Sequence, residues 1–104
     1  MRRVVPRVEA ARDIEAAVAY YIAEGGLNLA LRLVNEIESA FDHLAAHPLS
    51  GSPRYASLLD LHGLRCWQLR HFPYVIFYHA DAQIVDMWRV LHAERDIPAS
   101  LRDE

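Results

Sequence analysis

The sequence predicts a single α+β domain in which two helices precede most of the strands. The first half of the chain repeats its apolar residues at the three- and four-residue spacing of amphipathic helices. The second half holds short apolar runs rich in β-branched and aromatic residues, separated by turn residues. The 104 residues show no linker and no internal repeat, so we expect one domain over residues 1–104.

Two consecutive helices are expected in the first half. A short β-branched segment at residues 2–8 comes first, and Pro6 restricts it to the edge of a sheet. Helical periodicity then runs over residues 9–26 and stops at a Gly-Gly pair. A second helix is expected from Asn28, as its N-cap, to residues 47–48, where His-Pro ends it. The short glycine turn between the two helices predicts an antiparallel helix hairpin.

Three strands are expected in the second half, as an antiparallel sheet packed on the helix hairpin. They cover Gly63–His71, Tyr74–His79 and Ile84–Leu91, and a short polar loop joins the last two. A final short helix is expected after them, with Asp96 as its cap and Pro98 in its first turn.

The middle strand is apolar on both faces, although the helix hairpin can cover only one of them. Side chains alternate along a strand, so Ile76 and Tyr78 point one way and Val75 and Phe77 the other. Two alternatives stay open for the remaining face. It is either an uncovered apolar strip that a partner protein binds, or it lies beneath the loop Leu49–Leu61.

Charge and cysteine content restrict the function classes. The formal net charge is −3, and all 11 basic residues are arginine. Proteins that bind nucleic-acid backbones are usually basic, and a chain without lysine cannot form a lysine Schiff base. Cys66 is the only cysteine, which excludes an internal disulfide and a thiolate zinc site and favours a cytosolic protein. No apolar run reaches the roughly 20 residues of a membrane-spanning helix.

Two sets of side chains could carry chemistry. His43 and His47 have the i, i+4 spacing of metal ligands, but no third ligand accompanies them, and we expect no metal or cofactor. A second set could line one pocket and cleave a phosphodiester, because arginine stabilises the developing phosphorane charge and histidine transfers the proton. The alternative is that Arg89 and Arg95 pair with nearby acids. The set comprises Arg65, Arg70, Arg89, Arg95, His79 and His92, and the acids are Asp86, Glu94 and Asp96.

Six short motifs follow one another over nearly the whole chain. They are A-A-R-D-I (Ala10–Ile14), Y-Y (Tyr20–Tyr21), H-P-L-S-G (His47–Gly51), G-L-R (Gly63–Arg65), F-P-Y-V-I-F-Y (Phe72–Tyr78) and R-V-L-H-A-E-R-D-I (Arg89–Ile97). In order and spacing the series resembles the ParE branch of the RelE/ParE superfamily, the toxins of bacterial type II toxin–antitoxin systems. The predicted strand, helix hairpin and three strands match the layout that this resemblance implies.

The resemblance implies a growth-inhibiting toxin of the bacterial cytoplasm that a cognate antitoxin neutralises within a hetero-oligomer. In this family the antitoxin usually wraps a segment over the groove and sheet of the toxin, which would cover an apolar strip around Ile76 and Tyr78. DNA would be reached only through the antitoxin, and no membrane is involved. The residues expected to contact the antitoxin are Tyr74, Ile76, Tyr78, Arg65 and Trp67.

The resemblance leaves the target open between two branches. The ParE branch is associated with DNA gyrase, which implies a non-enzymatic inhibitor of gyrase without catalytic residues. The RelE branch cleaves ribosome-bound mRNA with lysines, arginines and a C-terminal tyrosine. This chain has no lysine and no tyrosine after Tyr78, and Ala93 stands where that tyrosine would be. If the chain were such an endonuclease, its residues would be Arg65, His92, Arg89 and Arg95; a third alternative is an inactive remnant that still binds the antitoxin.

Overall fold

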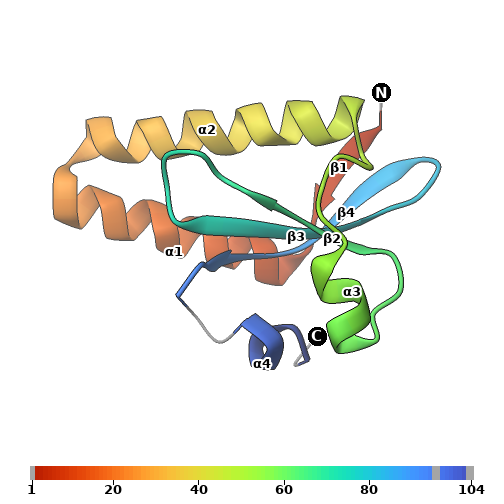
Figure 1. Cartoon of the computed structure of the whole chain (residues 1–104). Coiled ribbons are helices and arrows are strands. Elements are labelled where there is room, and N and C mark those ends of the chain that lie inside the picture. Colours follow the sequence, from red (N-terminus) through yellow and green to blue (C-terminus); the bar gives the residue numbers. More distant parts are fainter. Residues whose placement is uncertain (1, 95–96, 103–104) are drawn as a thin grey trace.

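The fold is that of an α+β domain, as the sequence predicts. The computed structural model describes residues 2–94 and 97–102, so Arg95 and the expected cap Asp96 lie outside the described residues. The elements are β1 (Arg3–Pro6), α1 (Val8–Gly25), α2 (Leu27–Ala46), α3 (Arg54–Leu59), β2 (Leu64–Gln68), β3 (Tyr74–Ala80), β4 (Ile84–His92) and α4 (Ile97–Arg102) (Figure 1).

The sheet has four strands in the order β1-β4-β3-β2, one more than expected. The strands β2, β3 and β4 are antiparallel neighbours, whereas β1 pairs with β4 in parallel, from Arg3 opposite Ile84 to Pro6 opposite Met87. Pro6 thus stands in an edge strand, where its missing N–H is tolerated. The parallel pairing could not be predicted from local signals, since β1 and its partner lie at opposite ends of the sequence.

The α1–α2 hairpin turns on glycine rather than on a side-chain cap. Gly26 has φ +86°, a conformation that glycine adopts without steric cost, and its N–H donates to the Ile22 carbonyl at 3.0 Å. The same residue is the N-cap of α2, without a side-chain bond, so Asn28 lies inside the helix. The prediction of Asn28 as N-cap was therefore wrong, because the glycine turn itself starts the helix.

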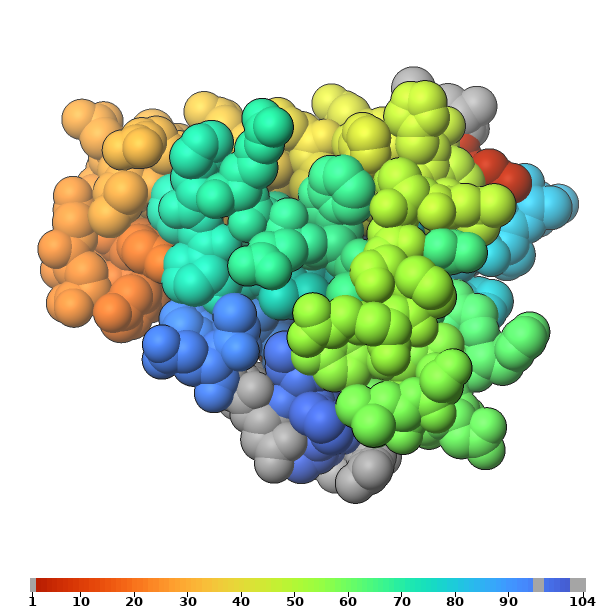
Figure 2. All heavy atoms as spheres, viewed as in Figure 1, coloured from red at the N-terminus to blue at the C-terminus, as the bar shows by residue number. Residues whose placement is uncertain are grey.

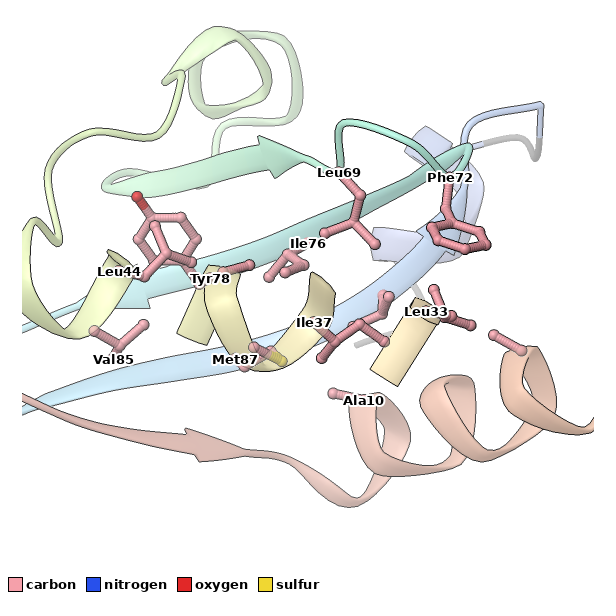
Figure 3. Packing of buried hydrophobic residues seen from close by; sticks show 13 residues of the cluster. Ala10, Leu33, Ile37, Leu44, Leu69, Phe72, Ile76, Tyr78, Val85 and Met87 are labelled. Carbon is pink, nitrogen blue, oxygen red and sulfur yellow. The ribbon is translucent and has the colours of Figure 1, made fainter. Parts of the chain in front are cut away.

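The helix hairpin covers one face of the sheet and buries the larger hydrophobic cluster there (Figure 3). Ile76 and Tyr78 of β3 are 0% exposed and point toward α2. The expectation that they form an uncovered apolar strip was therefore wrong. The cluster includes Ala10, Ala17, Leu33, Ile37, Leu44, Leu69, Phe72, Val85, Met87 and Val90.

The opposite face is covered by the chain itself. Phe77 is 0% exposed there, and the ring of Tyr55 on α3 packs edge-on against it at 5.4 Å between centroids. Ile97 and Leu101 of α4 complete this second cluster. Of the two alternatives for this face, folding of the Leu49–Leu61 segment over it is the correct one. The predicted final short helix is confirmed as α4, with Pro98 in its first turn, and it forms a second cover whose packing the sequence did not indicate.

Candidate functional site

Arg89, one of the candidate catalytic cations, is held in a clamp by Asp13 of α1. The Arg89 Nε and Nη2 groups donate to the two carboxylate oxygens of Asp13 at 2.7 and 2.9 Å. The Val90 backbone N–H donates to the same carboxylate at 2.9 Å. A β-bulge adjoins this contact: Phe77 pairs with Arg89 and Tyr78 with Met87, which leaves one extra residue in β4 between them.

The alternative of ion pairing therefore holds for Arg89, and its partner among the described residues is Asp13, which was not one of the acids expected; Asp96 lies outside the described residues. Its partner Asp13 is 76 positions away, whereas Asp86 pairs with Arg7 at 3.0 Å. The Glu94 backbone N–H donates to the His92 ring. Sequence reasoning overlooked Asp13, although the A-A-R-D-I motif contains it.

A second clamp holds the loop after α2 and occupies Arg65 and Tyr78. The Tyr78 hydroxyl donates to the Pro48 carbonyl at 2.8 Å and accepts from the Gly51 N–H at 2.9 Å. Arg65 donates to the carbonyls of Gly51 and Leu49 at 2.8 and 3.2 Å. A Cβ at Gly51 would lie 2.4 Å from the Tyr78 hydroxyl, so only glycine fits. Three of the sequence motifs thus meet in one structural contact.

The Tyr78 hydroxyl is suited to this bridging role and not to proton transfer. Burial, more than any nearby charge, raises the pKa of Tyr78 above its ordinary value, so the hydroxyl stays protonated and can donate. The same protonated state is required for its bond to the Pro48 carbonyl.

The candidate phosphodiester-cleaving set is dispersed over the sheet. Arg65 lies opposite Tyr78 on β3, while His92 lies opposite Tyr74, four positions and about 13 Å further along the strand. Arg70 stands beyond the end of β2. The expectation that these side chains line one pocket was therefore wrong for the described members.

His92 is also poorly placed to act as a base. Its Nδ1 accepts the Glu94 N–H at 3.1 Å, so the neutral ring carries its proton on Nε2. Its aromatic neighbour is Tyr74, edge-on at 5.3 Å. Burial first, and then the neighbouring Tyr21, raise the pKa of Tyr74, which keeps that phenol protonated.

A groove beside α1, the α1 groove, has a volume of about 460 Å³. Small alanines of α1 line it together with the rings of Tyr20, Tyr74 and His92. Tyr74 is only half-buried, so a partner could reach it. The groove is lined by Asp13, Ala16, Ala17, Tyr20, Tyr74, Val90 and His92.

A second groove, the α2 groove, runs between α2 and the segment from β2 to the β2–β3 turn. It consists of two adjoining hollows of about 460 and 390 Å³ that share Glu36, Ser39 and Arg70. Figure 2 shows the β2–β3 turn in teal beside the orange and yellow surface of α2. Arg32, Asn35, His71 and Phe72 line one end of the groove, and Ala40, His43, Trp67 and Leu69 line the other.

The turn is fixed against α2 by His71 and Glu36. The backbone N–H of His71 and its ring Nδ1 contact the two Glu36 carboxylate oxygens at 3.0 and 2.7 Å. At the other end, the His43 ring lies against Trp67 with 4.5 Å between centroids. His43 also faces His47 at 5.2 Å, and the described residues contain no group of three potential metal ligands.

The five residues expected to contact the antitoxin fall into three structural groups. Trp67 lines the α2 groove and Tyr74 the α1 groove, each half-buried. Arg65 is engaged in the loop clamp, while Ile76 and Tyr78 lie fully within the core. Accessible aromatic surface is thus found beside the helix hairpin rather than along the centre of β3.

Among the described residues, no helix is long and apolar enough to cross a membrane.

Comparisons with known proteins agree with the fold. Residues 4–97 match the model of a family described as ParE toxin of type II toxin-antitoxin system, parDE. A solved structure described as "Chromosomal ParDE TA system from P. aeruginosa" is similar to the chain, with a TM-score of 0.74 and 22% identity. The similarity covers 90% of this chain and 98% of that one, and at this identity it shows a shared fold. None of the curated proteins matches the chain.

Proposed function

The chain belongs to the ParE toxin family of type II toxin–antitoxin systems, and from this premise we propose that it arrests growth by binding DNA gyrase. The binding takes place in the bacterial cytoplasm and makes no covalent change. A cognate antitoxin binds the toxin in a hetero-oligomer and neutralises it. The observation that carries this proposal is the family match over residues 4–97, and the arrangement of the candidate catalytic residues supports a non-enzymatic mode.

Two of the candidate nuclease residues, Arg89 and Arg65, are engaged in structural bonds. The guanidinium of Arg89 is compensated by the Asp13 carboxylate in a contact whose side chains are only 15% and 12% exposed. The Asp13 carboxylate offsets the positive charge of the guanidinium, so Arg89 would attract the negative charge of a phosphorane only weakly. Arg65 is bonded to two loop carbonyls, far along the sheet from His92. Because both arginines are already engaged in structural contacts, protein binding is favoured over RNA cleavage.

Antitoxin contacts are proposed at the two grooves beside the helix hairpin. Trp67 and Tyr74 are half-exposed aromatic residues, the type that most often anchors protein interfaces. Ile76 and Tyr78 support these surfaces from within the core, and Arg65 shapes the loop beside Trp67. The proposal therefore keeps Trp67 and Tyr74 as contacts and assigns the other three residues a supporting role.

Induction of the chain in a bacterial host tests the proposed target. Incorporation of labelled thymidine, uridine and amino acids is followed over the first minutes after induction. We expect DNA synthesis to fall first and His92→Ala to leave this toxicity intact. Earlier loss of protein synthesis, abolished by His92→Ala, would instead identify an mRNA endonuclease. Normal growth, with the antitoxin still bound, would identify an inactive remnant.

A biochemical assay separates gyrase from other causes of arrested DNA synthesis. Purified chain is added to gyrase and relaxed plasmid, and supercoiling is followed with and without the antitoxin. We expect supercoiling to be inhibited and the antitoxin to restore it. Unchanged supercoiling at saturating toxin would refute gyrase as the target while leaving the family membership untouched.

A further inference from the structure

The loop between α2 and α3, residues 47–53, is held by hydrogen bonds on both sides of its apex. The Ser50 backbone N–H and hydroxyl both donate to the His47 carbonyl, at 3.1 and 2.7 Å. On the other side of the apex, Ser52 and Cys66 exchange two backbone hydrogen bonds at 2.8 and 2.9 Å. Together with the second clamp described above, these bonds fix the backbone of the α2–α3 loop.

The apex of the α2–α3 loop is a leucine that faces solvent. The Leu49 side chain is 68% exposed, the highest value of any exposed large hydrophobic residue in the described part of the chain. Its carbonyl accepts a hydrogen bond from Arg65 at 3.2 Å, so the exposed side chain extends from an ordered backbone. Since no loop has to be ordered on binding, burial of this side chain by a partner would contribute to affinity with little entropic cost.

Two arginines at the loop carry charges that no carboxylate compensates. Arg65 donates to the carbonyls of Leu49 and Gly51, which are neutral acceptors. Arg54 is exposed, and its guanidinium lies over the Tyr55 ring at 4.8 Å and donates to the Tyr55 hydroxyl at 3.0 Å. Among the described residues, no carboxylate forms an ion pair with either arginine. The loop therefore combines an apolar apex with uncompensated positive charge.

We propose that the α2–α3 loop is the surface of this chain that contacts gyrase. Leu49 enters an apolar pocket of the partner, and Arg54 and Arg65 face acidic side chains around that pocket. The inference rests on the function proposed above, which names gyrase but no surface for it. None of these three residues lines either groove, so this contact is separate from the antitoxin contacts at Trp67 and Tyr74.

Charge complementarity supports an acidic protein surface as the occupant. The chain has a net charge of −3, so a locally positive loop is the part of the molecule that an acidic partner is attracted to. A guanidinium has five N–H donors, and the Arg54 side chain donates to the Tyr55 hydroxyl through only one of its nitrogens. The remaining donors can bind a carboxylate through two parallel hydrogen bonds. An apolar centre with charged groups at its rim is the usual organisation of a protein interface.

A second copy of the chain and a nucleic acid fit the loop less well. A two-fold interface built on this loop would bring together the uncompensated arginines of both copies, and their like charges repel. A single nucleic-acid strand is bound by a run of cations and by aromatic rings on which its bases stack. The Tyr55 ring is not free for this, because the Arg54 guanidinium lies over it and Phe77 packs against it.

The test measures binding of the full chain to gyrase and to the antitoxin in parallel. The variants are Leu49→Ser, Arg54→Glu and the control Leu27→Ser. Leu27 is 62% exposed but begins the 20-residue helix α2, so it lies about 30 Å from the loop that follows this helix.

We expect Leu49→Ser and Arg54→Glu each to bind gyrase, and to inhibit supercoiling, at least about tenfold more weakly than the wild type. The effect of Arg54→Glu should shrink at high salt, because it is electrostatic. Both variants should keep the wild-type affinity for the antitoxin within about twofold, and Leu27→Ser should keep both affinities within the same range.

Circular dichroism and the urea midpoint establish that the variants are folded, which is expected because only exposed side chains change. If the wild-type chain does not bind gyrase, the function proposed above fails and the inference fails with it. If the wild type binds gyrase and Leu49→Ser matches Leu27→Ser, the inference about the loop is wrong and the function stands. An equal loss of gyrase and antitoxin affinity would instead place the loop in the antitoxin interface and overturn the inference. Binding of a single-stranded RNA oligonucleotide that Arg54→Glu abolishes, with gyrase affinity unchanged, would overturn it as well.

Discussion

Asp13 on α1 and Arg89 on β4 are 76 positions apart in the chain and form a two-bond ion pair at 2.7 and 2.9 Å. The pair stands where β1 ends: the last residue of β1 that pairs with β4 is Pro6, opposite Met87. Beyond that point the Asp13 carboxylate takes over as partner of β4 and accepts the Val90 N–H at 2.9 Å. A side chain on α1 thus accepts a backbone hydrogen bond from β4 beyond the end of the edge strand β1.

Replacement of Asp13 by asparagine is expected to destabilise the fold by about 3 kcal/mol, because it leaves a largely buried guanidinium without its counter-charge. The side chains of Asp13 and Arg89 are only 12% and 15% exposed, so water cannot replace the lost charge efficiently. Urea unfolding measures the change. The control is Glu15→Gln on the exposed side of α1, which should cost little. Equal midpoints for the two variants would show that the ion pair contributes nothing.

Loss of the Tyr78 hydroxyl is expected to destabilise the fold by about 1–3 kcal/mol, the cost of leaving buried polar groups unpaired. In Tyr78→Phe the Pro48 carbonyl and the Gly51 N–H both lose their partner. The control is Tyr55→Phe, whose hydroxyl accepts from the exposed Arg54 side chain. Thermal unfolding of the two variants gives the comparison. A Tyr78→Phe variant as stable as Tyr55→Phe would contradict the clamp.

Because Ile76 and Tyr78 are buried, a charged residue placed at either position would not test whether it contacts the antitoxin. Both side chains are 0% exposed, so a charged residue there would be buried without a partner and would unfold the domain. Weakened antitoxin binding in such a variant would therefore not identify an interface. Arg32 and Arg70 are exposed and can be changed without this complication.

Local patterns predicted most of the fold because they reflect periodic burial. The spacing of Ile14 and Val18 on α1, and of Ile37 and Leu44 on α2, follows the face that packs on the sheet, and this indicated the helix hairpin. The two short helices α3 and α4 hold six residues each, too few for a period to be visible. Pro98 indicated α4, but nothing in the sequence indicated α3 or the packing of α4 on the sheet, so one sheet face appeared to be uncovered.

Contacts between distant segments limited the prediction of the site. The parallel pairing of β1, the Asp13–Arg89 pair and the Tyr78 bridge each join residues whose relation no local spacing reveals. The quoted motifs did include the residues of the two clamps, among them Asp13, Arg89 and Tyr78. The sequence could show that these residues matter, whereas only the structure shows that they act by holding the fold together.

The Glu36–His71 contact is expected to contribute a pH-dependent part of the stability. Burial acts to raise the pKa of Glu36, but hydrogen bonds and attraction from His71 outweigh it and lower that pKa below its ordinary value of 4.5. A lowered folded-state pKa gives a contribution that is present above pH 4.5 and is lost as the pH falls through the folded-state value.

Glu36→Gln removes this contribution and is measured by urea unfolding between neutral and acid pH. We expect the variant to be less stable than the wild type at neutral pH and the difference to shrink below pH 4.5. Glu38→Gln on the exposed side of α2 serves as the control and should follow the wild type. A difference that stays constant down to acid pH would refute the contribution.

Cys66 is expected to be unreactive in the folded chain. Its side chain belongs to the cluster beneath α3 and α4, and burial is the main cause that raises the pKa of the thiol, although Arg54 acts weakly in the opposite direction. Since the thiolate is the reacting species, both access and ionisation oppose modification. A chromogenic disulfide reagent should therefore label native protein far more slowly than protein unfolded in urea.

The variant Leu101→Ala tests whether α4 shields Cys66 from the reagent. Leu101 is 2% exposed and packs in the same cluster as Cys66, so its truncation should loosen α4 and speed labelling in the absence of denaturant. Val8→Ala, at an exposed residue of α1, is the matched control and should leave the rate unchanged. If native Cys66 reacted as fast as unfolded chain, α3 and α4 would not shield this face. Labelling of Leu101→Ala at the wild-type rate would instead assign the shielding to α3 alone, whose Tyr55 ring lies against Phe77.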